Sequence, residues 1–221
     1  MNVLAIDTAG TACFAAIYDS ETDRLSGSAG ADIGRGHAEQ LMGFIDGALA
    51  ASGRQLGDID RIAVTIGPGS FTGIRVGVAA ARGFALALRV PVVGVSTLAA
   101  LAGSAGKMYP RLPVLVAMDA KRDELYCQIF EPDGTPRTGP QVLEIIEAKK
   151  LLQNFEGVIC GSATRHLTQT PLPGVAQIDA VDTAVVARLG AMADPQGNRP
   201  SPLYLRGPDV KSQSGFAVAR V

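Results

Sequence analysis

The sequence predicts an α/β protein of two duplicated lobes, each a mixed β-sheet with helices on both faces. Two patterns predict this fold class. Short apolar or β-branched runs alternate with longer segments whose apolar residues recur at helical spacing. The same order of strands and helices also occurs twice along the 221 residues. A chain of this length can hold one large domain or two small lobes.

The first half of the chain is expected to contain five strands and three helices. The expected strands span 3–7, 11–19, 24–32, 61–66 and 90–95, and the expected helices span 37–52, 76–88 and 96–104. Within 37–52, apolar side chains follow the three- and four-residue spacing of an amphipathic helix, at Leu41, Phe44, Ile45, Ala48 and Leu49.

The second half of the chain repeats this order. Leu4-Ala5-Ile6-Asp7 aligns with Val116-Ala117-Met118-Asp119, and the same offset aligns Phe14 with Tyr126. Further elements are expected at 112–119, 137–143, 144–154, 158–161 and 182–193. Such a duplicated arrangement of meandering strands and helical crossovers is typical of ribonuclease-H-like lobes in actin-type (ASKHA) proteins. We expect a first lobe over 1–108 and a smaller second lobe with a C-terminal tail over 109–221.

The segment Gly67-Pro68-Gly69-Ser70-Phe71-Thr72-Gly73-Ile74-Arg75 connects an expected strand to an expected helix. Its glycines allow a tight turn, and Ser70 or Thr72 can cap the helix. Helix N-termini attract anions, which favours a phosphate site. A P-loop, however, needs lysine after its last glycine, and Ile74 stands there. A tight strand-to-helix turn is therefore the simpler interpretation.

Composition predicts a soluble cytoplasmic protein. A hydrophobic fraction of 47% argues against disorder, and a net charge of −1 argues against strong autonomous binding of nucleic acid. The three cysteines lie in apolar runs without zinc-site spacing, which indicates buried thiols in a reducing compartment. No signal peptide is recognised. The apolar stretch 76–105 is interrupted by Arg82, Arg89 and Pro91, so we expect no membrane span.

Five pieces of the sequence, taken together, resemble the TsaB (YeaZ) family. They are Leu4-Ala5-Ile6-Asp7-Thr8-Ala9, His37-Ala38-Glu39-Gln40-Leu41, Gly67 through Arg75, Asp119 through Tyr126, and Pro202-Leu203-Tyr204-Leu205-Arg206. The resemblance implies a non-catalytic subunit of the bacterial machinery that makes threonylcarbamoyladenosine in transfer RNA. It implies pairing with the catalytic subunit TsaD, help in recruiting the ATPase TsaE, and contact with transfer RNA only through the complex. A homodimer is expected when the chain is alone.

The resemblance also implies that pairing uses two helices of the first lobe. The helix after Gly73 is apolar on nearly all sides, so a sheet alone would not cover it. The expected partner interface consists of His37, Leu41, Met42, Ile45, Arg75, Val78 and Arg82.

Residues that could carry chemistry are few, and we expect no catalytic residue, metal site or cofactor. The related catalytic subunit binds metal through His-x-x-x-His, but Leu41 replaces the second histidine here. Asp7, Thr8 and Gly10 are candidates for a vestigial nucleotide site, whereas Asp119 lacks a following glycine. Three alternatives stay open at this point: turn-capping aspartates, a stand-alone actin-like ATPase or kinase with a nucleotide in the cleft between lobes, and a metallopeptidase.

Overall fold

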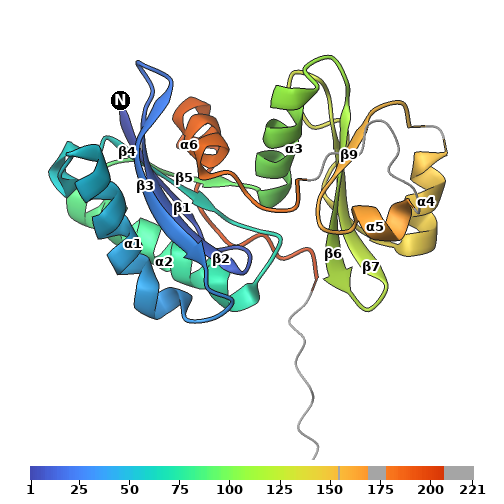
Figure 1. Cartoon of the computed structure of the whole chain (residues 1–221), viewed down its shortest axis with the longest axis horizontal. Coiled ribbons are helices and arrows are strands. Elements are labelled where there is room, and N and C mark those ends of the chain that lie inside the picture. Colours follow the sequence, from blue (N-terminus) through green and yellow to red (C-terminus); the bar gives the residue numbers. More distant parts are fainter. Residues whose placement is uncertain (154, 169–177, 207–221) are drawn as a thin grey trace, which may run out of the picture.

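Two mixed β-sheets form the framework of the protein in the computed structural model, which describes residues 1–153, 155–168 and 178–206 (Figure 1). The first sheet has the strand order β3-β2-β1-β4-β5, and the second has the order β8-β7-β6-β9. The strands of the first sheet are β1 (Asn2–Asp7), β2 (Ala12–Asp19), β3 (Arg24–Asp32), β4 (Arg61–Thr65) and β5 (Val92–Val95). Those of the second are β6 (Val114–Lys121), β7 (Glu124–Phe130), β8 (Gln141–Glu144) and β9 (Val158–Cys160).

The four strands of the second sheet repeat the order and directions of β3, β2, β1 and β4, which confirms the predicted duplicated α/β fold of the actin type. In the first sheet β1, β2 and β3 form an antiparallel meander, and β4 and β5 add in parallel. In the second sheet β6, β7 and β8 form the meander, and β9 adds parallel to β6. The repeat is inexact at its hairpins, because Asp7 pairs with Phe14 whereas Met118, not Asp119, pairs with Tyr126.

The helices also follow the sequence prediction, with shifted ends. They are α1 (His37–Ser52), α2 (Phe71–Leu88), α3 (Thr97–Met108), α4 (Ile145–Leu152), α5 (Thr164–Leu167) and α6 (Thr183–Met192). Helix α2 begins well before residue 76 because the Ser70 hydroxyl accepts a hydrogen bond from the amide of Gly73. The short helix α5 and the 3₁₀ turn at Leu56–Asp58 were not predicted.

Helix α2 is long and apolar enough by composition to cross a membrane, the one such helix within the described ranges. In the fold it packs one side against the first sheet, and 33% of it is buried. Its side chains Ile74, Val78 and Ala81 are buried with the residues of the first sheet, while Arg75 and Arg82 are exposed on its outer side. A helix with one buried and one charged side is typical of the surface layer of a folded domain.

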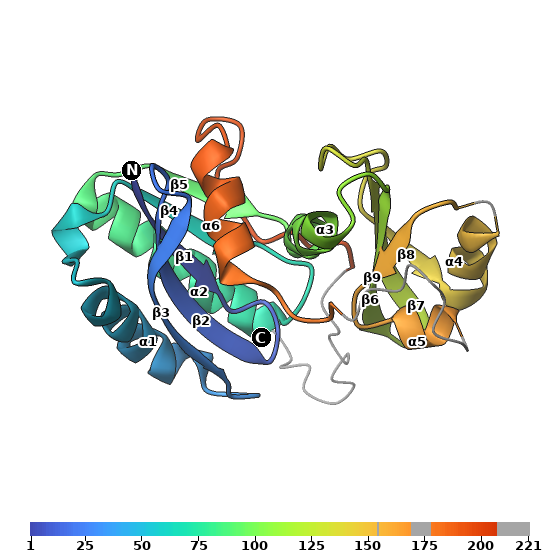
Figure 2. The same cartoon turned by 45° about the horizontal axis from the view of Figure 1, so that its top comes forward.

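The two sheets exchange their last helices. Helix α3 follows β5 in the chain, yet Leu98 and Leu101 pack with Val114 and Val158 of the second sheet. Helix α6 comes from the second half of the chain, yet Val186 packs with residues of β1, β4 and β5. Figures 1 and 2 both show α6 and α3 lying between the sheets. The division at residue 108 remains a proposal, since each half supplies a helix to the sheet of the other.

Arg61 fixes the end of α6 to the first sheet. Its Nη1 atom donates to the carbonyl oxygens of Gly190, Ala191 and Ala193 at 3.0, 2.8 and 2.9 Å. The last carbonyls of a helix have no partner within the helix, and a cation there also interacts favourably with the helix dipole. Arg61 therefore caps a helix that is distant in the sequence.

We expect Arg61→Ala to lower the free energy of unfolding by about 2–3 kcal/mol, because hydrogen bonds from a charged donor to buried carbonyls are lost together. Urea unfolding followed by circular dichroism measures this change. Arg54→Ala, at an exposed arginine, is the matched control and should change stability little. Equal stability of the two variants would contradict the capping role of Arg61.

Candidate functional site

The turn after β1 is filled by the start of α2. The Ser70 amide donates to the Ala9 carbonyl at 2.6 Å, and the Thr8 hydroxyl donates to the Gly73 carbonyl at 2.8 Å. A β-carbon at Gly69 would overlap the Ala9 carbonyl oxygen, and one at Gly73 would overlap that of Thr8. The glycines of the 67–75 segment are therefore needed for close backbone approach. This agrees with the interpretation of the segment as a strand-to-helix turn.

Asp7 caps this turn from inside the first lobe. Its Oδ1 atom accepts from the Thr65 hydroxyl at 2.7 Å and from the Ala9 amide at 3.1 Å, and the residue is only 3% exposed. Burial raises the pKa of Asp7 above its ordinary value, although the hydrogen bonds from Thr65 and Ala9 oppose this rise. Thr8 is also buried, and Gly10 alone of the vestigial nucleotide candidates is exposed. Contacts within the chain thus occupy Asp7 and Thr8.

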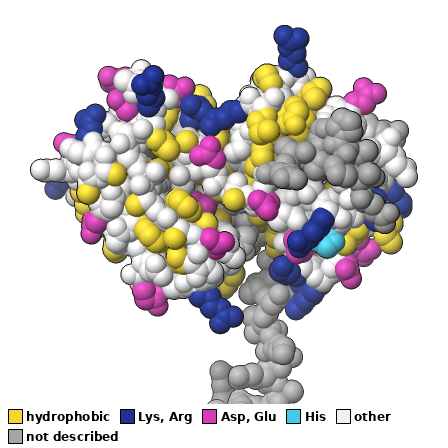
Figure 3. All heavy atoms as spheres, viewed as in Figure 1, with side chains coloured by type: hydrophobic (Ala, Val, Ile, Leu, Met, Phe, Trp, Pro, Cys, Tyr) yellow, Lys and Arg dark blue, Asp and Glu magenta, His cyan; other side chains and the backbone are white. Residues whose placement is uncertain are grey.

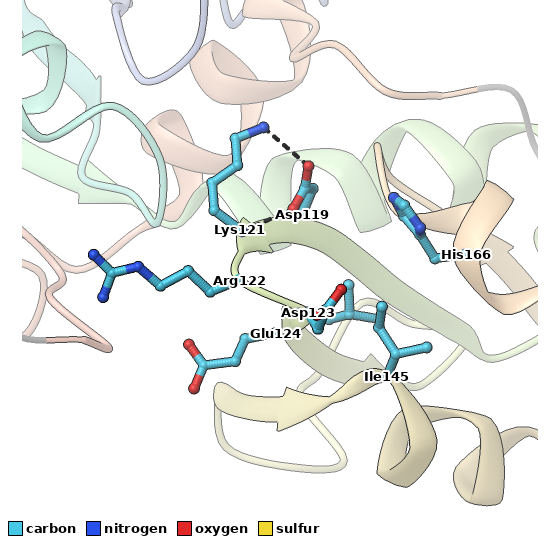
Figure 4. Close-up of a pocket in the computed structure, with 8 residues that line it drawn as sticks. Asp119, Lys121, Arg122, Asp123, Glu124, Ile145 and His166 are labelled. Carbon is cyan, nitrogen blue, oxygen red and sulfur yellow. Dashed lines mark hydrogen bonds and ion pairs between the residues drawn. The ribbon is translucent and has the colours of Figure 1, made fainter.

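Asp119 lies beside a pocket of about 200 Å³ in the second lobe. Figure 4 shows its carboxylate facing Lys121, whose Nζ lies 2.9 Å away. Partial burial would raise the pKa of Asp119, but its bonds to Lys121 outweigh this and hold the pKa below its ordinary value. The other lining residues are Arg122, Asp123, Glu124, Leu125, Ile145 and His166. The ion pair with Lys121 therefore occupies the Asp119 carboxylate at the edge of this pocket.

The backbone of this second turn differs from a phosphate-binding loop. Lys121, Arg122 and Asp123 have φ angles of 65°, 56° and 61°, a left-handed conformation that glycine would adopt without strain. Bulky side chains therefore surround the turn where a phosphate cradle would need exposed backbone amides. The sequence expectation of no phosphate cradle after Asp119 agrees with this geometry.

His37 is a core residue rather than half of a metal pair. Its Nε2 atom lies 3.2 Å from the Ala12 carbonyl oxygen of β2, and the residue is buried. Leu41, one turn further along α1, is fully buried. No group of three or more His, Cys, Asp or Glu residues is placed to hold a metal ion in the described parts of the chain. The imidazole therefore joins α1 to β2.

The predicted partner interface needs correction. Leu41, Ile45 and Val78 lie in the core between the helices and the first sheet, and Val78 is only 4% exposed. These residues, with His37, belong to the helix sides that face the sheet, so they cannot contact a partner directly. Met42 is 44% exposed, and Arg75 and Arg82 are also exposed. The outer surface of α1 and α2 retains only these three of the predicted residues.

Sequence reasoning missed two exposed apolar side chains of α2. Leu86 is 83% exposed, and Phe71 is also exposed at the first turn. Arg75 and Arg82 mark one side of α2 as charged, but because the helix is apolar on nearly every other side, its sequence does not show that Leu86 faces water. We call the exposed residues Met42, Phe71, Arg75, Arg82 and Leu86 the α1–α2 surface.

Tyr204 extends this surface from the end of the described chain. The Arg75 guanidinium stacks over the Phe71 ring at 3.7 Å, and its Nε donates to the Tyr204 hydroxyl at 2.7 Å. The Leu203 amide donates to the Ile66 carbonyl at 2.7 Å and so fixes this segment to the end of β4. The bond from Arg75 to Tyr204 is invisible to local sequence patterns, because the two residues are far apart in the chain.

A second group of hydrophobic side chains is visible on the face shown in Figure 3, near the end of α3. Met108 is 61% exposed there, and Leu112 follows it closely in the chain. This site lies on a different helix from the α1–α2 surface. It supplies a comparison site for substitutions on α1 and α2.

Comparisons with known proteins assign the chain. A family model described as "TsaD: tRNA N6-adenosine threonylcarbamoyltransferase" matches residues 18–158. The solved structure of YeaZ from Pseudomonas aeruginosa superposes with a TM-score of 0.77 at 27% identity, covering 92% of this chain and 99% of that one. The Escherichia coli protein named tRNA threonylcarbamoyladenosine biosynthesis protein TsaB is 37% identical. The chain belongs to the TsaB/YeaZ family.

The extent of these matches differs among relatives of the TsaB/YeaZ family. The Escherichia coli alignment covers 60% of this chain and 56% of that protein, so the match spans little more than half of that curated relative. An uncharacterized Mycobacterium tuberculosis protein is 33% identical over 95% of this chain and 93% of its own length. A tRNA N6-adenosine threonylcarbamoyltransferase from Jannaschia is 35% identical, covering 57% of this chain and 35% of that protein.

We expect Asp7→Asn to stabilise the protein at pH 7. The pKa of Asp7 is raised on folding, so its protonated form favours the folded state, and stability from this group falls as pH rises through the folded pKa. Asparagine keeps an acceptor for Thr65 without the buried charge. The gain should shrink as the pH falls toward about 4, where the unfolded aspartate also binds its proton. Urea unfolding at several pH values measures it, and a loss of stability at pH 7 would contradict this account.

We expect Gly73→Ala and Gly83→Ala to have opposite effects, although both lie in α2. Alanine favours a helix over glycine by about 1 kcal/mol, and a β-carbon at Gly83 meets nothing within 4 Å. At Gly73 the β-carbon collides with the Thr8 carbonyl, so we expect a net loss of about 2 kcal/mol or more. Thermal and urea unfolding of both variants measures the difference. A stabilised Gly73→Ala variant would refute the close contact.

Proposed function

We propose that the chain is a non-catalytic scaffold and activator subunit required for threonylcarbamoyl transfer to an adenosine of transfer RNA. The observation that carries this proposal is the α1–α2 surface, where Leu86 and Met42 expose apolar area on an otherwise well-packed lobe. Contiguous exposed apolar surface marks interaction sites, so the proposal requires Met42 and Leu86 to contribute to one binding surface. Relatives of this chain carry names from threonylcarbamoyladenosine biosynthesis, which supplies the pathway.

The partner in this proposal is the catalytic subunit TsaD. The family model that matches residues 18–158 is that of TsaD, and this range includes both α1 and α2. A TsaD-type partner would therefore carry counterparts of the same two helices. Related surfaces commonly meet about a two-fold or near two-fold axis, which here places four helices together. The same surface could hold two copies of this chain when TsaD is absent.

The chemistry of the first lobe supports an accessory role. The Asp7 turn is occupied by α2, and the His37 ring is engaged by the backbone of β2. Activation would then come from holding TsaD in a competent arrangement, with the ATPase TsaE and transfer RNA joining through the complex. A cytoplasmic location follows from that role.

We expect Leu86→Glu to weaken binding to TsaD at least about tenfold while leaving folding intact, because a charge would be buried at the interface centre. Titration of purified chain into TsaD from the same organism measures affinity, and circular dichroism reports folding. Met108→Glu, another exposed apolar position, is the matched control and should bind normally. Val78→Glu should unfold the protein, because Val78 is a core residue.

Reconstitution tests the function itself. In the presence of unmodified transfer RNA and an activated threonylcarbamoyl donor, adding the native chain to TsaD and TsaE should increase threonylcarbamoyladenosine formation, and the Leu86→Glu variant should not. Asp7→Asn should activate as well as the native chain if Asp7 serves only the fold. The proposal would be refuted if the chain neither co-eluted with TsaD nor increased transfer-RNA modification. It would also be refuted if the isolated chain hydrolysed ATP, or transferred its phosphate, with multiple turnovers.

A further inference from the structure

Opposite charges line the outer sides of α1 and α2. On α1, Glu39 and Asp46 recur at heptad spacing and are exposed. On α2, Arg75 and Arg82 recur at the same spacing, and Arg89 follows at the C-cap of the helix; all three are exposed. Residues one heptad apart lie on the same side of a helix. We call Glu39 and Asp46 the acidic row, and Arg75, Arg82 and Arg89 the basic row.

The two rows do not neutralise each other within the chain. Arg75 is held by Phe71 and Tyr204, whereas Arg82 and Arg89 make no side-chain ion pair among the residues the structure describes. Glu39 and Asp46 likewise make none within these ranges. The exposed side chains Met42 and Leu86 belong to the same two helices. The charged side chains of the two rows thus lie on the same helices as exposed apolar side chains and form no ion pairs with each other. Their charges are therefore available to a partner.

Such a surface is complementary in charge to a related surface that packs against it about a two-fold axis. If the α1 helix of one chain lies against the partner's counterpart of α2, each row meets charges of the opposite sign. The whole chain has a net charge of only −1, so attraction would come from this local pattern and not from overall charge. Charges at the edge of an interface mainly accelerate association and exclude wrong partners.

We propose that the acidic and basic rows select the partner of the α1–α2 surface by charge. This rests on the pairing proposed above. The occupant is a related two-helix surface of the catalytic subunit, which presents acidic side chains toward α2 and basic side chains toward α1. Arg82 and Asp46 are the central specificity residues, because both are exposed and lie within their helices rather than at the ends.

The test is the association rate of the full chain with TsaD, measured by stopped-flow or surface binding between about 50 and 500 mM salt, where screening of exposed charges strengthens. Association of the native chain should slow as salt rises. Arg82→Glu should lower the rate at low salt by about tenfold or more and weaken its salt dependence. Lys150→Glu makes the same charge change at an exposed site on α4 and should change neither the association rate nor its salt dependence.

A second variant separates local pattern from net charge. Asp46→Lys combined with Arg82→Glu keeps the net charge at −1 and inverts the centre of both rows, so it should still associate slowly. Charge selection would be overturned if the native chain associated with TsaD at a rate independent of salt. It would also be overturned if Arg82→Glu and the double variant both associated at the native rate. Either result would leave the proposed pairing intact. Failure of the native chain to bind TsaD at any salt concentration would instead refute the proposed function. Circular dichroism confirms that each variant is folded.

Discussion

The first lobe depends on one close approach, between the turn after β1 and the first turns of α2. The Ser70 amide donates to the Ala9 carbonyl, and the Thr8 hydroxyl donates to the Gly73 carbonyl. Protein interiors are packed so densely that such a contact sets the position of the whole helix. The same contact adjoins the buried residues Asp7 and Thr8, so it orients α2 and leaves Gly10 as the exposed residue of that turn.

The position of α2 in turn decides which residues reach solvent. With Ile74 and Val78 turned toward the sheet, Leu86, Arg82 and Phe71 must point outward. Tyr204 then covers part of Arg75 from the end of the described chain, so the first turn of α2 is held from two directions. An interaction surface built on rigid, doubly supported helices loses little conformational entropy on binding.

Much of the fold was predictable because it is recorded in local patterns. Helix α1 has the predicted bounds, since its apolar spacing is regular and Gly53 ends it in a left-handed conformation. The start of α2 was placed too late because Gly73 and Gly77, which are poor helix formers, obscure its first turns. The exposure of Leu86 could not be predicted from an apolar helix, nor could the bonds from Arg61 to α6 or from Arg75 to Tyr204. Those depend on tertiary contacts between segments that are distant in sequence.

The exchange of α3 and α6 has a consequence for how this molecule folds. A fragment ending at residue 108 would keep α3 without the strands β6 and β9, against which Leu98 and Leu101 pack. It would also expose Val3 and Val93, which pack with Val186 of α6. Neither half is therefore a complete globule, so we expect the two halves to unfold in one cooperative transition.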